Sequence, residues 1–112
     1  MITIEQLEAF GANTKEGLER CLNDEGFYLS LIPSALDGSS YEGLEKALAN
    51  KDLESAFEAA HALKGVLGNL ALTPIYEPMS EITELLRAKT DTDYSELLNR
   101  VKEKREALAA LL

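Results

Sequence analysis

Residues 53–72 read LESAFEAAHALKGVLGNLAL, and the apolar pattern of this stretch decides the fold. Its aliphatic side chains recur at intervals of three and four, at Ala56, Ala59, Ala60, Leu63, Val66, Leu67 and Leu70. This spacing places them on one face of an α-helix. A helix over 53–71 would span roughly 30 Å at about 1.5 Å per residue. We therefore predict a long amphipathic helix here, capped at its start by Asp52 or a neighbour.

The segments before this helix also carry helix signals. A capping box at 3–6 opens a short helix that is predicted to end at Gly11. Thr14 is predicted to cap a second helix, and a third helical pattern begins at Asp24. Pro33 lies inside that third pattern and is predicted to kink or break it near the preceding residue.

The remaining segments predict three more helices. The polar stretch at 37–40 is predicted to be a turn, followed by a helix over 40–50. Thr73 is predicted to cap the next helix, with Pro74 in its first turn. The last helix is predicted to run from about Tyr94 towards the C-terminus. With no strand pattern and no linker, the sequence predicts one all-α domain over 1–112, an antiparallel up-down four-helix bundle with short N-terminal helical segments.

Composition and charge exclude several function classes. Twenty acidic residues against eleven basic ones give a net charge of −9, which repels nucleic acid. The basic stretch at 102–108 is interrupted by glutamates and reads as a solvated helix face. No stretch has the ~18 apolar residues that a membrane span needs, and the first ten residues do not resemble a signal peptide. Cys21 is the single cysteine and is predicted to be a buried small side chain, so we expect a cytoplasmic protein.

The only histidine lies on the polar face of the helix at 53–71. On a helical wheel of about 100° per residue, His61, Lys64, Gly65, Gly68 and Asn69 share the side opposite the aliphatic residues. A glycine inside a helix costs about 1 kcal/mol relative to alanine. Absent side chains around an exposed imidazole allow another protein to approach closely. Gly68 has a second interpretation, namely relief of packing against a neighbouring helix.

These residue types favour phosphoryl transfer. A neutral imidazole nitrogen is a nucleophile near neutral pH, and the Lys64 ammonium can lie beside an anion formed on the His61 ring. Lys64 could instead be an ordinary surface lysine paired with Glu58 or Asp52. The chain has no nucleotide-binding motif, so the phosphoryl donor is expected to be another protein.

The stretch AHALKGVLGNL at 60–70 strongly resembles the core motif of histidine-containing phosphotransfer (HPt) domains, roughly A-H-x-L-K-G-x-x-x-N-L. Residues 17–36 also look like the upstream helices of bacterial HPt domains. The resemblance implies an up-down four-helix bundle that relays phosphoryl groups between aspartates of response-regulator receiver domains. A hybrid sensor kinase is a further expected partner, and Mg²⁺ is expected on the receiver, with no cofactor on this chain.

The resemblance also implies roles for individual residues. His61 would be the phosphoacceptor and Lys64 the cation that stabilises the phosphate. Gly65 would give the receiver room, and Asn69 would contact it on the docking face, where the wheel also puts Gly68.

Three alternatives compete with this interpretation. Glu58 and His61 have the spacing of a bundle metal site, but such sites need a second pair. A helical adaptor could bind and inhibit a receiver or kinase without any phosphate on His61. The chain could also be a structural bundle that dimerises, although we expect a monomer.

Overall fold

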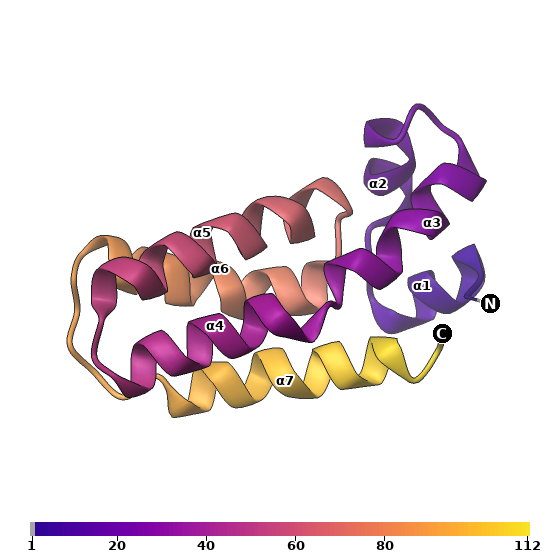
Figure 1. The fold of residues 1–112 in the computed structure, drawn as a ribbon. Helices are drawn as coiled ribbons and strands as arrows, with labels where there is room; N and C mark the ends of the chain where they lie inside the picture. The colour runs from indigo at the N-terminus through magenta and orange to yellow at the C-terminus, as the bar shows by residue number, and fades with distance from the viewer. Residues whose placement is uncertain (1) are drawn as a thin grey trace.

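The computed structural model describes residues 2–112, and this part of the chain is all-helical, without a strand (Figure 1). Its helices are α1 (Ile4–Phe10), α2 (Thr14–Arg20), α3 (Glu25–Ala35), α4 (Gly38–Ala49), α5 (Leu53–Asn69), α6 (Thr73–Arg87) and α7 (Ser95–Ala109). None of the helices in this part combines the length and the hydrophobicity that crossing a membrane requires.

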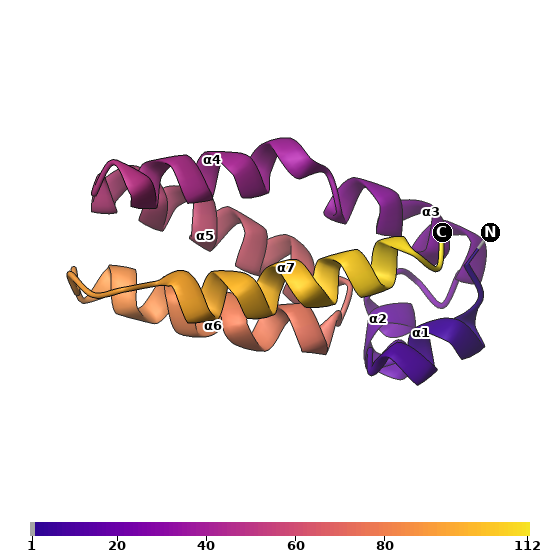
Figure 2. The ribbon, with the colours of Figure 1, turned by 90° about the horizontal axis from the view of Figure 1, so that it is seen from below.

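The helices form two groups. α5 packs against α4 and α6, and α6 packs against α7. Figures 1 and 2 show α4 to α7 running lengthwise past one another, while the shorter α1, α2 and α3 gather at one end. The last turn of α7 lies at that same end of the molecule (Figure 2). The long helices therefore form an extended surface, and the short helices lie at one end of it.

Local capping explains where the first helices begin and end. The predicted capping box is present, because the Thr3 side chain accepts from the backbone of Gln6 and the Gln6 side chain accepts from the backbone of Thr3. Gly11 ends α1 with a left-handed φ of 112°, which glycine adopts without strain. The prediction for α2 was wrong by one residue: Asn13 is its N-cap, and Thr14 instead donates to Glu8 at 3.0 Å.

The sequence predicted a kink or a break near Ile32, and the break is wrong. α3 continues through Pro33 and ends after Ala35. Pro33 is exposed and lies only two residues before the end of the helix. Its missing N–H therefore costs the helix a single hydrogen bond in its last turn. Leu36 is the C-cap of α3, and Asp37 is the N-cap of α4.

Two helices start earlier than the sequence predicts, α4 by two residues and α6 by one. The residues from Gly38 to Ser40 form the first turn of α4 rather than a loop, since Asp37 accepts from the backbone N–H of Ser39 at 3.2 Å. Thr73 is the first residue of α6, and its hydroxyl donates backwards to Ala71 instead of capping the helix. Ala71 has a φ of 53°, and this left-handed residue turns the chain between α5 and α6.

The core is aliphatic, as the composition suggests. Its fully buried side chains come from both groups of helices and include Leu7, Tyr28, Ile32, Leu44, Leu67, Ile75, Met79, Ile82 and Leu108. Cys21 is 4% exposed, which confirms its interpretation as a buried residue. Val66 was wrongly grouped with the core and is 43% exposed.

Buried contacts fix the short helices to the end of α5. The Tyr28 hydroxyl donates to the carbonyl of Leu70 at 2.8 Å, and the Asn13 N–H donates to the carbonyl of Ala71 at 3.0 Å. Burial raises the pKa of Tyr28 to about 12, so its hydroxyl keeps its proton. Gly17 lies against the Tyr28 ring so closely that a Cβ there would fall 2.5 Å from it. The position of α2 beside α5 is therefore set by packing.

Candidate functional site

His61 is exposed near the middle of α5. Asp52 is the N-cap of the helix, and its side chain accepts from the Ser55 N–H at 3.1 Å. Hydrogen bonds from the Ser55 side chain and then from its backbone lower the pKa of the Asp52 carboxyl. The residues that α5 buries are Ala56, Ala60, Leu63 and Leu67. Because these side chains fill the inner face, the His61 imidazole lies on the outer face, as the wheel predicts.

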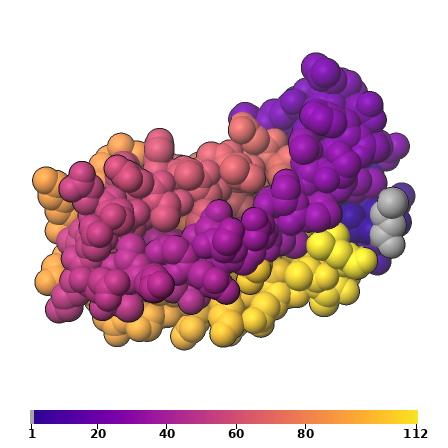
Figure 3. All heavy atoms as spheres, viewed as in Figure 1, coloured from indigo at the N-terminus to yellow at the C-terminus, as the bar shows by residue number. Residues whose placement is uncertain are grey.

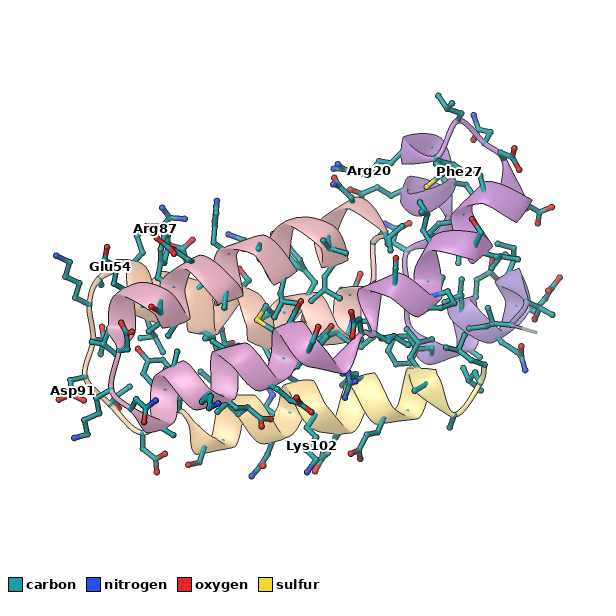
Figure 4. The ribbon with its side chains drawn as sticks, in the orientation of Figure 1. Arg20, Phe27, Glu54, Arg87, Asp91 and Lys102 are labelled. Carbon is teal, nitrogen blue, oxygen red and sulfur yellow. The ribbon has the colours of Figure 1, made fainter. Side chains whose placement is uncertain are left out.

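The His61 ring stacks on an aromatic neighbour one turn earlier. The ring centroids of Phe57 and His61 are 5.5 Å apart, and the ring planes differ by 14°. The guanidinium of Arg87, from α6, lies 5.1 Å from the Phe57 centroid. Figure 4 shows Arg87 beside the N-terminal half of α5. Stacking limits the orientations of the imidazole without covering its exposed edge.

Lys64 is linked to α6. Its Nζ donates to Glu84 Oε1 at 3.3 Å, so its partner is neither Glu58 nor Asp52. The second oxygen of Glu84 accepts from Arg87 Nε at 3.1 Å. Hydrogen bonds from Lys64 and then Arg87 lower the pKa of the Glu84 carboxyl, which is therefore ionised at neutral pH. The Lys64 ammonium, one turn from His61, is already shared with one carboxylate.

The two glycines on this face have different surroundings. A Cβ built on Gly65 would meet nothing within 4 Å. A Cβ built on Gly68 would lie 3.2 Å from the ring of Tyr76 on α6. Packing within the chain therefore accounts for Gly68, in line with its second interpretation, and does not account for Gly65.

Asn69 lies two turns beyond His61 and contacts α2. Its Oδ1 accepts from Arg20 Nη1 at 3.4 Å, and Arg20 also binds Glu16 at 3.1 Å. Figure 4 shows Arg20 reaching from α2 towards the C-terminal end of α5.

One open groove contains all five residues singled out from the sequence. It is lined from α5 by His61, Lys64, Gly65, Gly68 and Asn69, and from the neighbouring segments by Glu16, Arg20, Ala71, Thr73, Tyr76 and Glu77. The sequence missed the residues from α2 and α6, because nothing local links them to α5. Phe57 could have been found from its spacing of four residues before His61.

Metal ligands do not gather in this groove. Among residues 2–112, no three or more histidine, cysteine or acidic side chains come together in a way that could hold a metal ion. The groove instead presents an exposed imidazole and, one turn later, an ammonium.

Comparison with known families adds a decisive observation. The family model of the Hpt domain matches residues 39–111, well over half of the chain. The chain belongs to the Hpt domain family. Membership gives it a phosphotransfer-related role in two-component signalling, where Hpt domains interact with receiver domains. Searches of curated proteins and of solved structures gave no significant match.

The family match covers fewer residues than the resemblance described from the sequence. It begins at residue 39, in the first turn of α4, and extends into the last residues of the chain. α1, α2 and α3 lie outside it, including the segment 17–36 that resembles the upstream helices of bacterial members.

Proposed function

We propose that this Hpt protein relays phosphoryl groups between aspartates of receiver domains through His61. The observation that carries the proposal is the open surface around the imidazole: His61 is exposed, Lys64 follows one turn later, and Gly65 leaves empty space between them and an incoming protein. A receiver domain can reach His61 without displacing any part of this chain.

The proposed reaction is an in-line displacement at phosphorus. The unprotonated ring nitrogen of His61 attacks the acyl phosphate of the first receiver, the P–O bond to the aspartate breaks, and an N–P bond forms. The aspartate leaves as a carboxylate, and the other ring nitrogen of His61 keeps its proton. In the second step, an aspartate of another receiver attacks the phosphorus, and the N–P bond breaks to return the neutral imidazole.

The neighbours of His61 have distinct roles in this proposal. Lys64 offsets the charge of the phosphorylated ring, and Gly65 admits the receiver. Asn69 contacts the docked receiver, and Gly68, without a side chain, leaves the groove open to it. The receiver supplies the Mg²⁺ and most of the catalytic groups, so this chain acts as a carrier without a kinase activity of its own.

The proposal includes an architecture. α4 to α7 act as an antiparallel up-down four-helix bundle, α1 to α3 complete a single domain, and the protein works as a cytoplasmic monomer. The buried hydrogen bond between Tyr28 and Leu70 supports the single domain, because it joins the short helices to α5.

Label transfer tests this function directly. The purified chain is incubated with phosphorylated receiver domains and with autophosphorylated hybrid kinases, and His61→Gln is the matched variant. We expect acid-labile, alkali-stable label on the wild-type chain and none on His61→Gln, with equal helicity by circular dichroism. Label retained in the variant would contradict the assignment. Tight receiver binding without any label would favour a phosphate-independent adaptor instead.

A further inference from the structure

One wall of the groove beside His61 comes from outside the family match. Glu16 and Arg20 of α2 line the groove together with Lys64 and Asn69 of α5. α2 precedes residue 39, where the match begins. A partner that reaches His61 in this protein therefore meets a surface that the matched part of the chain does not supply.

This wall is held in place by buried contacts. Tyr28 on α3 is fully buried and binds the carbonyl that follows α5, and Gly17 of α2 packs on its ring. The Arg20 side chain then spans from α2 to Asn69. These contacts hold α2 beside the end of α5.

A partner docked over His61 would also contact α2. Figure 3 shows the segment that contains α2 and α3 standing beyond the surface of α5, which makes a step at the end of that helix. Asn69 is eight residues from His61, or about 12 Å along α5. A standard interface buries about 800 Å² on each partner, equivalent to a disc of about 16 Å radius. An interface centred on His61 therefore includes Arg20.

Arg20 contributes little to the fold itself. Its ion pair with Glu16 joins two side chains that are 51% and 47% exposed, and surface pairs of this kind add little to stability. A guanidinium with remaining N–H groups is well suited to bind a carboxylate through two parallel hydrogen bonds.

We propose that Arg20 binds the docked receiver domain, by pairing its guanidinium with a carboxylate on the receiver. Glu16 and Asn69 hold the side chain at the inner corner of the step. The inference rests on the proposed function for the identity of the partner. Arg20 of α2 contacts α5 at Asn69, about 12 Å along that helix from His61, so it acts on docking and not on the chemical step.

Arg20→Gln and Arg100→Gln form a matched pair of variants. Arg100, on α7, is 47% exposed and pairs with Glu81 at 3.6 Å, so both changes remove one half-exposed, ion-paired guanidinium. A panel of purified receiver domains is screened for binding to the wild-type chain, and the tightest binder is used. Its Kd is measured by titration calorimetry, and transfer rates are measured against receiver concentration.

We expect Arg20→Gln to raise Kd and KM about tenfold with kcat unchanged, and the difference to shrink at high salt. Arg100→Gln should stay within about twofold of the wild type, as expected of a remote surface residue. Unchanged Kd and KM in Arg20→Gln, or an effect on kcat alone, would overturn the proposal. Equal unfolding midpoints exclude a folding defect.

A small phosphodonor separates this inference from the proposed function. Phosphoramidate transfers its phosphoryl group to an imidazole with release of ammonia and needs no docking surface. If neither phosphoramidate nor any receiver labels the wild-type chain, the relay function fails, while the receiver Kd still tests Arg20. If Arg20→Gln loses the phosphoramidate label, Arg20 acts at His61 itself and the docking role is wrong.

Discussion

The two flanks of His61 across the outer face of α5 differ in how strongly they are connected to the rest of the molecule. On one side, Phe57 stacks on the imidazole and is joined through Arg87 and Glu84 to Lys64. On the other side, Gly65 is surrounded by empty space. The connected side fixes the ring and supplies charge, whereas the empty side admits another molecule. A phosphoryl carrier needs both properties at one side chain.

Filling the empty side should have the largest effect. We expect Gly65→Gln to slow transfer from a phosphorylated receiver about a hundredfold, the size of a strong interface hot spot. Phosphoramidate labelling of His61 in the same variant should remain, since a small donor does not need the space. A Cβ at residue 65 meets nothing within 4 Å, and the rest of the glutamine can extend into solvent, so the unfolding midpoint should not fall.

The comparison would break down if Gly65→Gln transferred at the wild-type rate. The empty side would then be unused by the partner, and the glycine would need another explanation. Gly43 on α4 is the matched control, because a Cβ there also meets nothing within 4 Å. Gly43→Gln should leave transfer unchanged.

Removing the cation on the connected side should have a smaller effect. Lys64→Gln is expected to slow transfer about tenfold, in the range for losing one hydrogen bond to a charged group. The effect is moderate because Lys64 is already partly neutralised by Glu84. Rapid-quench measurement of label on His61 gives the rate, and an unchanged rate would remove Lys64 from the chemistry.

Removing the carboxylate should act in the opposite direction. Glu84→Gln frees Lys64 from a competing anion, so we expect the phosphoryl equilibrium to shift about threefold towards His61, a small effect as for other exposed ion pairs. Glu81→Gln is the control, since it removes an equally exposed carboxylate of α6 that pairs with Arg100. The ratio of label on His61 to label on the receiver at equilibrium measures the shift. A shift away from His61 would mean that Glu84 holds Lys64 in its working position.

The sequence predicted the helix that carries the site, because a 3.6-residue period and a side-chain cap are local signals. The predicted range of 53–71 agrees with α5 to within two residues, and His61 is exposed as expected. The prediction that Val66 is buried was wrong because this residue lies about 90° from the centre of the buried face on the helical wheel. An apolar side chain at that angle can be either buried or exposed. The exposed fraction of Val66, 43%, reflects that edge position.

The contacts that the site residues make with other helices could not be predicted from the sequence. Lys64 and Glu84 are 20 residues apart, and Arg20 and Asn69 are 49 apart. Which surface positions meet across such separations depends on how the helices pack, and periodicity within one helix does not contain that information. The same limit applies to Gly68, whose close neighbour Tyr76 belongs to the next helix.

The smallest effect distinguishes the two glycines by stability alone. Gly65→Ala should stabilise the fold by about 1 kcal/mol, the helix-propensity gain at an open position. Gly68→Ala should gain less or nothing, because the new methyl group lies 3.2 Å from the Tyr76 ring and the ring must shift. Urea unfolding of both variants gives the comparison. In a Tyr76→Ala background, the missing gain at Gly68 should reappear, as expected for residues coupled by contact. Equal gains in unfolding free energy at both positions in the wild-type background would show that the Tyr76 ring moves at no cost. The glycine at 68 would then have to be explained by the docked partner, like the glycine at 65.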